Sequence, residues 1–175
     1  MSNLEGRFDS HEKWLKHEGG ERLVLLEHDL EGVSIRDRNL SQCQIQRCNL
    51  KNATIRNVNL SRSLLTDCDF TRVNFSHTNL HSCDLSGSIL KDNILRETIG
   101  NKKEVKSFQL DLYSVAYTWD RIQFRCQNYS LDEWEGLSDD FLNNIDVEAP
   151  EWRVKWKELL VRILEFSPAK STEGI

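Results

Sequence analysis

Every fifth residue between Leu25 and Leu95 is apolar, and this spacing constrains the fold more than any other feature of the sequence. The fifteen positions are Leu25, Leu30, Ile35, Leu40, Ile45, Leu50, Ile55, Leu60, Leu65, Phe70, Phe75, Leu80, Leu85, Leu90 and Leu95. A fixed period of this kind is the signature of a repeat architecture, in which each repeat packs on its neighbours. The chain of 175 residues can hold one such array and a smaller companion segment.

A spacing of five residues matches neither standard periodicity. Five steps along an α-helix end on a different face, and five steps along a strand reverse the direction of the side chain. Each quintet must therefore contain a corner as well as a flat side. The residue before each apolar centre is often Asp or Asn, whose side chain bonds to its own backbone at turns. The residue two before the centre also points inward and is mostly small: Val33, Cys43, Cys48, Ala53, Val58, Ser63, Cys68, Val73, Thr78, Cys83 and Ser88.

Several quintets share one order: a small residue, then Asp or Asn, then Leu or Phe, then two variable residues. The plainest run over residues 48–52, 68–72, 78–82 and 83–87. This order resembles the motif of the pentapeptide repeat family. The resemblance implies a mainly β fold, a right-handed quadrilateral β-helix in which four quintets make one coil, and it gives just under four coils over residues 21–99.

The segments on either side are expected to cover the ends of this solenoid. In residues 1–20 we predict an N-terminal capping helix over residues 9–18, with Asp9 as N-cap and with Trp14 and Leu15 as its apolar contribution. A C-terminal α+β subdomain is predicted over residues 100–167, and a disordered tail over residues 168–175.

The C-terminal subdomain reads as two to three antiparallel strands between residues 108 and 126, because apolar and polar residues alternate there. A capping box of Ser130 and Glu133 opens a short helix, a second begins at Ser138, and Pro150 starts a longer helix with Trp152 and Trp156 on one stripe. This tail resembles the C-terminal segment of pentapeptide repeat proteins from bacteriophages and prophages. Its landmarks are residues 99–101, 126–127, 132–134 and 138–139 and the two Trp residues of the last helix.

A few residues depart from the repeat pattern. Arg38 occupies an inward position and must escape to solvent or force a bulge, whereas His28 and Asn93 are expected to mark frayed ends. Ile89 and Ile94 replace the usual Asp or Asn, so we expect the tail to cover them.

The candidate interaction residues are Arg36, Arg56 and Arg96, which follow the apolar centres of one side of the predicted solenoid. Stacked coils would line them up about 5 to 10 Å apart, where they could pair with an acidic partner or phosphates. The alternative is a solvated face that Asp37 and Glu97 neutralise. Trp152 and Trp156 are a second candidate, since an exposed apolar stripe would favour a homodimer through the C-terminal subdomain over a monomer.

We predict no enzyme activity, no cofactor and no metal site. The sequence has no glycine-rich phosphate loop and no catalytic motif built on Ser, Cys or His. The cysteines at inward positions are interpreted as small apolar filler, and His77 and His81 lie on either side of a corner where no helical spacing joins them.

The leading functional hypothesis is a non-catalytic interaction protein of phage or prophage origin that binds a host or phage macromolecule and could interfere with host defence. A DNA-mimicking topoisomerase (gyrase) inhibitor or protector is an alternative, but residues 29–100 carry nine Lys or Arg against eight Asp or Glu, so the solenoid is close to neutral. A nucleotide or small-molecule binder is the third hypothesis. We expect a protein partner, no direct nucleic-acid binding, no membrane segment and a cytoplasmic location.

Overall fold

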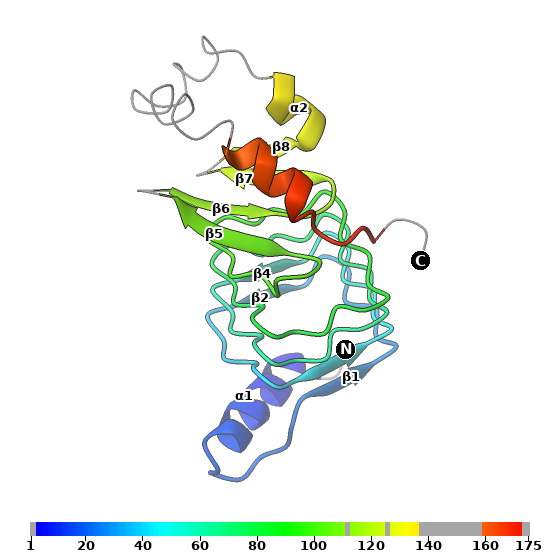
Figure 1. The fold of residues 1–175 in the computed structure, drawn as a ribbon. Helices are drawn as coiled ribbons and strands as arrows, with labels where there is room; N and C mark the ends of the chain where they lie inside the picture. The colour runs from blue at the N-terminus through cyan, green and yellow to red at the C-terminus, as the bar shows by residue number, and fades with distance from the viewer. Residues whose placement is uncertain (1–2, 111–112, 125–126, 137–158, 173–175) are drawn as a thin grey trace.

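The computed structural model describes residues 3–110, 113–124, 127–136 and 159–172. Figure 1 shows helix α1 (Leu4–Leu15) at one end of the molecule, a stack of coils in the middle and a small sheet at the other end. Within the described residues, no helix is long and apolar enough to span a membrane.

The coils stack through parallel pairing between residues that are 20 positions apart. Strand β1 (Val24–Leu26) pairs with β3 (Gln44–Gln46), and β2 (Ser34–Arg36) pairs with β4 (Thr54–Arg56). Parallel bridges with the same offset continue from Asp29–Asn49 to Asn79–Ile99. Four quintets therefore make one coil, as the resemblance to the pentapeptide repeat motif implies.

The apolar centres fill the axis of the stack. Fourteen of the fifteen are at most 2% exposed, and Leu30 is the half-buried exception. The inward positions two residues earlier are also buried from Cys43 through Asn93, which confirms the predicted second inward position. The small side chains at these positions leave room for the larger centres, so the interior is continuous.

Each quintet turns at a residue with left-handed backbone, and these residues recur every fifth position from Glu27 to Lys102. The corner lies two residues after each centre, where Gly32 and Gly87 adopt this conformation without strain. The Asp or Asn before the centre supports the corner: Asn49 Oδ1, for example, accepts a hydrogen bond from the backbone N–H of Lys51 at 3.1 Å. The predicted bonding of these side chains to their own backbone is confirmed.

Helix α1 begins earlier than predicted. Its N-cap is Asn3, whose Oδ1 accepts the Gly6 N–H at 2.9 Å, and Asp9 lies inside the helix. The residues that α1 buries are Phe8 and His11, so the prediction of Trp14 and Leu15 as its main apolar contribution is wrong. The helix starts six residues closer to the N-terminus than predicted, and its face with Phe8 and His11 is the buried one.

Asp9 pairs with Arg38 of the first coil. The Arg38 guanidinium leaves the interior and donates to Glu5 Oε2 at 2.6 Å, Asp9 Oδ1 at 2.7 Å and Glu12 Oε2 at 3.1 Å, all on α1. Glu12 Oε1 also accepts the backbone N–H of Asn39 at 2.9 Å. Arg38, a misfit in the repeat pattern, is therefore one of the residues that join the helix to the first coil.

His11 links α1 to the first coil through both ring nitrogens. Its Nδ1 accepts the Leu23 N–H at 3.0 Å, so Nε2 carries the proton and donates to the Ser41 carbonyl at 3.0 Å. Burial lowers the pKa of His11 below its usual value. The neutral form is the one that fits, because a second ring proton would meet the Leu23 N–H.

We expect this contact to make stability depend on pH. Below about pH 6.5 the unfolded chain binds a proton at His11 that the folded chain resists, so the free energy of unfolding should fall as the pH drops from there towards the lowered pKa. Urea unfolding at pH 7.5 and at pH 5.5 should show this decrease in the wild type and in His17→Asn, whose histidine is exposed. An equal pH dependence in His11→Gln would contradict the assignment.

The C-terminal segment forms a four-stranded antiparallel sheet, one strand more than the upper prediction. The strands are β5 (Lys106–Leu110), β6 (Tyr113–Tyr117), β7 (Arg121–Phe124) and β8 (Gln127–Ser130), paired in that order. The capping box before α2 (Leu131–Gly136) is confirmed: the Ser130 N–H donates to Glu133 Oε2 at 2.7 Å, and the Glu133 N–H donates to Ser130 Oγ at 3.1 Å. The helix predicted from Ser138 and most of the one from Pro150 lie outside the described residues, and residues 159–166 are helical.

The chain remains packed after this helix, so the predicted disorder is wrong for residues 168–172. Thr172 is buried between the last coil and the sheet, where its Oγ1 accepts the Leu90 N–H and the Trp119 Nε1–H, each at 3.0 Å. Ala169 is also buried, and Tyr117 donates its hydroxyl to the Ser167 carbonyl at 2.8 Å. These contacts fasten the C-terminal segment across the end of the stack.

Side chains of the sheet also bond to backbone groups of the last coil. Asp120 Oδ2 accepts the Asp92 N–H at 3.0 Å, and Ser107 Oγ accepts the Gly100 N–H at 2.9 Å. Asn93 is fully buried and donates to the Phe70 carbonyl at 2.6 Å, so the expected fraying at this residue is wrong.

The tail does not cover the apolar side chains of the last coil as fully as predicted. Ile89 is half-buried, but Ile94 is 41% exposed. The sheet reaches this coil through hydrogen bonds along its edge, which leaves the outward side of Ile94 open.

Candidate functional site

The three candidate arginines lie on one side of the solenoid. Arg36 and Arg56 are directly paired residues of β2 and β4, and both are exposed. The bridges that join Thr54 to Asn74 and Asn74 to Ile94 carry the same side upward to Arg96. The predicted alignment is therefore present, with the smaller Ser76 in the gap between Arg56 and Arg96.

Two hollows follow these arginines. The first, of about 430 Å³, is lined by Arg36, Asp37, Arg56, Asn57 and His77. The second, of about 230 Å³, is lined by Arg56, Asn74, Ser76, His77, Ile94, Arg96 and Gln123. Arg56 and His77 belong to both, so the two hollows adjoin. We call Arg36, Arg56, Arg96 and these two hollows the arginine face.

The neighbouring carboxylates are mostly engaged by other groups. Asp37 Oδ1 accepts Asn57 Nδ2–H at 2.7 Å, and Glu97 Oε2 lies 2.9 Å from His77 Nδ1. Glu97 Oε1 lies 3.7 Å from Arg96 Nε, which is a loose contact. Neutralisation by Asp37 and Glu97, the alternative considered from the sequence, therefore reaches Arg96 only weakly.

Arg36 and Arg56 keep their charges open to solvent. Neither makes an ion pair with any described residue, and Arg36 donates only to Ser34 Oγ, at 3.0 Å. Like charges directly opposite each other on paired strands destabilise the pair. An anion placed between them would relieve this repulsion and accept hydrogen bonds from both guanidinium groups.

The second candidate, Trp152 and Trp156, lies outside the described residues. The apolar stripe at these two residues therefore stays a prediction.

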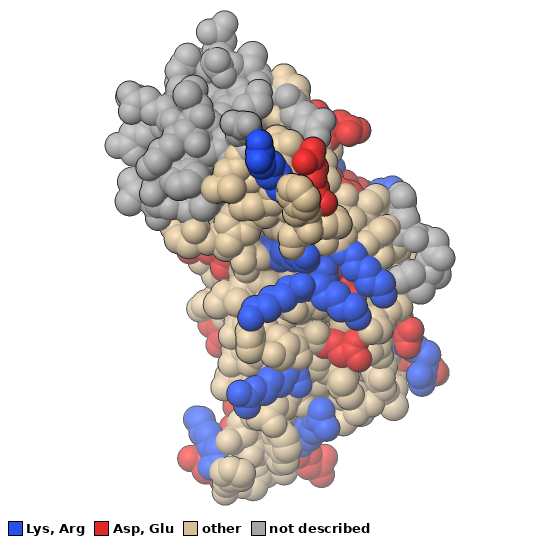
Figure 2. Space-filling view, viewed as in Figure 1, with Lys and Arg blue, Asp and Glu red and all other residues tan. Residues whose placement is uncertain are grey.

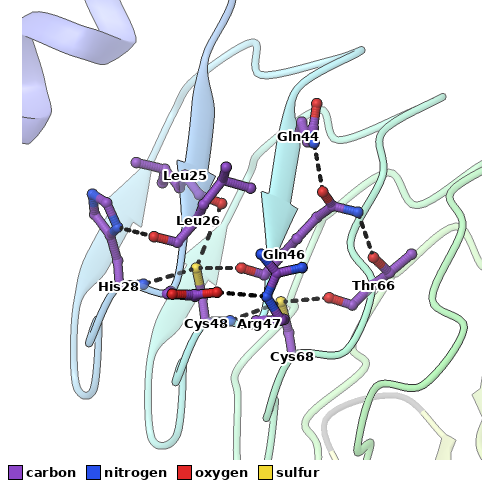
Figure 3. Close-up of polar contacts among 10 residues, drawn as sticks. Leu25, Leu26, His28, Gln44, Gln46, Arg47, Cys48, Thr66 and Cys68 are labelled. Carbon is purple, nitrogen blue, oxygen red and sulfur yellow. Dashed lines mark hydrogen bonds and ion pairs between the residues drawn. The ribbon is translucent and has the colours of Figure 1, made fainter.

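The cysteine ladder lies inside the solenoid. Figure 3 shows Cys48 and Cys68 on adjacent coils, with the Cys48 Sγ–H pointing to the carbonyls of Leu25 and Gln46. Burial raises the pKa of Cys43 to about 11 and that of Cys83 to about 12. The four described cysteines are buried free thiols and so pack as the sequence analysis predicts. Among the residues that the structure describes, no group of three or more His, Cys, Asp or Glu is placed to hold a metal ion.

A second group of basic side chains was not predicted. Figure 2 shows Lys and Arg side chains gathered on one face, at the level where the chain leaves the last coil. The Lys170 N–H bonds to the Lys103 carbonyl at 2.9 Å, which brings these two lysines together. Hydrogen bonds from Ser86, together with the charges of both lysines, lower the pKa of Asp84. Lys103 is visible in the sequence beside Lys102, but the docking of Lys170 needs the packed tail.

Comparison with known proteins supports the repeat assignment. Residues 29–62 and 55–92 match the family model of pentapeptide repeats, in eight copies. The match ends before the C-terminal sheet, so the resemblance of the tail to phage proteins has no support from it. No curated protein matches the chain.

Three solved structures illustrate the likeness, each over less than half of this chain. HetL, a pentapeptide repeat protein involved in heterocyst differentiation regulation in the cyanobacterium Nostoc sp. strain PCC 7120, is 22% identical over 42% of this chain and 40% of its own, with a TM-score of 0.27. Rfr23 from the cyanobacterium Cyanothece 51142 is 20% identical over 42% of this chain and 81% of its own, with a TM-score of 0.30. A pentapeptide repeat protein of the Arabidopsis thaliana thylakoid lumen is 18% identical over 45% of this chain and 58% of its own, with a TM-score of 0.25.

Proposed function

We propose that this protein is a non-catalytic interaction protein that binds an acidic segment of another protein through the arginine face. The observation that carries the proposal is the directly paired Arg36 and Arg56, exposed and without an ion pair among the described residues. Guanidinium groups on stacked coils form a regular row of donors, which suits the carboxylates of an extended acidic chain.

The shape of the face favours a macromolecule over a small ligand. The two hollows adjoin along the solenoid and are lined mainly by polar side chains, whereas small-molecule sites are concave and mostly apolar. Asp37 in the first hollow would repel a compact phosphate, but an extended chain can place its carboxylates at the arginines and a neutral residue beside Asp37.

The test is capture of partners from the native host with wild-type protein and with Arg36→Gln/Arg56→Gln/Arg96→Gln. The control is Lys13→Gln/Arg62→Gln/Lys91→Gln, which removes the same charge from exposed positions outside both hollows. A partner identified by mass spectrometry should then bind the arginine variant about tenfold or more weakly, and the control within about twofold of wild type. Equal affinity for all three proteins would refute the proposal.

Gyrase inhibition or protection by DNA mimicry is a second candidate because pentapeptide repeats are the matched family. A DNA mimic needs a column of acidic side chains, and the charges of residues 29–100 nearly balance. A supercoiling assay with purified gyrase tests it, and no effect at micromolar protein would remove it.

Nucleotide binding on the arginine face is the third candidate. A thermal-shift panel separates it from protein binding, since a ligand at 100 times its dissociation constant should stabilise the fold by about 2.7 kcal/mol.

The remaining parts of the proposal rest on the sequence. A phage or prophage origin and a role against host defence rest on the landmarks of the C-terminal tail. A cytoplasmic location rests on the polar N-terminal residues and the odd number of cysteines. We further propose that the stack is a right-handed quadrilateral β-helix, with α1 and the C-terminal sheet as its caps. A monomer fits the fastened C-terminal segment better than a homodimer through this end.

A further inference from the structure

We propose that the outer edge of the first coil binds an extended cationic peptide segment as an added strand. The segment would run along residues 28–31 and place apolar side chains in the neighbouring hollow of about 550 Å³. The hollow is lined by Leu4 of α1 and by residues 27–33. It lies at the end of the stack and shares no lining residue with the arginine face.

Helix α1 and its neighbours satisfy only part of the edge of the first coil. Arg7 donates to the Val24 carbonyl, His11 bonds to Leu23 N–H and the Ser41 carbonyl, and Glu12 accepts the Asn39 N–H. His28 Nδ1 lies 2.7 Å from the Leu26 carbonyl, as Figure 3 shows. These contacts fall before and after residues 29–36, so one stretch of the edge is left open.

The open stretch has the geometry of a strand edge. One coil further on, the Asn49 N–H donates to the His28 carbonyl at 3.0 Å and the Asn49 carbonyl accepts the Leu30 N–H at 2.7 Å. The equivalent N–H and C=O of Asp29 point away from the stack and meet no hydrogen-bonding partner among the described residues. Unpaired edge groups of this kind are the template for strand addition.

The apolar floor of the hollow is the open end of one column of centres. Leu50, Phe70 and Leu90 in this column are at most 1% exposed, but Leu30 is only half-buried. The other three centres of the first coil, Leu25, Ile35 and Leu40, are at most 2% exposed. An apolar side chain of an added strand would continue this column. It would cover Leu30 in the same way that Leu30 covers Leu50 in the next coil.

The acidic side chains around the hollow favour a cationic occupant. Asp29 and Glu31 accept hydrogen bonds from the neutral amides of Asn49 and Asn52 and make no ion pair with the described residues. Glu27 has only an exposed contact with Arg47. A second copy would bring an identical acidic rim against this one, so a segment with Lys or Arg between apolar residues fits better.

The test uses three blocked peptides and fluorescence anisotropy with the full-length protein. The probe Lys-Val-Lys-Leu-Lys-Val-Lys should bind, and its Glu-for-Lys counterpart should not. A version of the probe with alternate backbone nitrogens methylated keeps the charge and side chains but cannot pair with the edge. We expect it to bind at least about tenfold more weakly, and equal binding of the methylated peptide, or no binding of the probe at millimolar concentration, would overturn the proposal.

Protein variants test whether the peptide binds at this edge. Asp29→Asn/Glu31→Gln keeps the side-chain oxygens that accept from Glu31 N–H and from Asn49 and Asn52, and Asn occurs naturally at the equivalent position 49. This variant should bind the probe about fivefold more weakly than the wild type. The control Glu18→Gln/Glu21→Gln makes the same charge change at exposed residues outside the hollow and should bind the probe as the wild type does. Equal weakening by both pairs would indicate non-specific attraction and contradict the site. A wild-type dimer in sedimentation that tightens in Asp29→Asn/Glu31→Gln would assign the edge to a second copy instead.

Discussion

Phe75→Ala should lower the free energy of unfolding by about 3–5 kcal/mol, the largest effect that we expect from a single substitution. Phe75 is fully buried on the axis of the solenoid, and its ring centroid lies 5.6 Å from that of Phe70 at an interplanar angle of 54°. The cavity would lie in the middle of the stack, where coils on both sides are held in register by backbone bonds. Neighbouring centres cannot move in to fill it without breaking that register.

The control is Phe166→Ala. Phe166 is 85% exposed, so its removal should change the free energy of unfolding by no more than about 0.5 kcal/mol. Urea unfolding followed by circular dichroism measures both variants. A loss below about 1 kcal/mol for Phe75→Ala would show that the axis is loosely packed, contrary to the structure.

The sequence predicted the solenoid well because the period itself is a packing constraint. A centre such as Leu50 must face inward in every coil, and a corner must follow at Asn52, so fifteen quintets repeat one local solution. Local bonds reinforce it, since the Asn49 side chain fixes the turn after its own centre. Several of the wrong predictions concern residues whose partners are distant in the chain.

Arg38 and the tail illustrate that limit. Arg38 breaks the pattern, but its three carboxylate partners lie 26 to 33 residues earlier on α1, and no spacing rule connects them. Residues 168–172 carry no period, and Thr172 is buried by a contact with Leu90, 82 residues away. Long-range contacts of this kind decide the ends of the solenoid, where local pattern is weakest.

The sequence predicted where the arginines of the arginine face lie, but it did not predict which of them form ion pairs. The 20-residue coil places Arg36 opposite Arg56, as the resemblance to pentapeptide repeats implies. The sequence also places Asp37 and Glu97 beside the arginines. In the fold, however, other hydrogen-bond donors compete with the arginines for these carboxylates. Asn57 and His77, one coil away from these carboxylates, engage them and leave Arg36 and Arg56 unpaired among the described residues.

Thr172→Val should lower the free energy of unfolding by about 1–3 kcal/mol, because valine keeps the shape of the side chain but leaves the buried Leu90 N–H without its acceptor. Trp119 Nε1–H keeps the Leu90 carbonyl at 3.0 Å as a second acceptor, so the loss should not reach that of Phe75→Ala. Thr172→Ser retains the hydroxyl and should stay within about 1 kcal/mol of wild type. Urea unfolding followed by tryptophan fluorescence measures both variants. Wild-type stability in Thr172→Val would mean that the C-terminal segment does not fasten the end of the stack in solution.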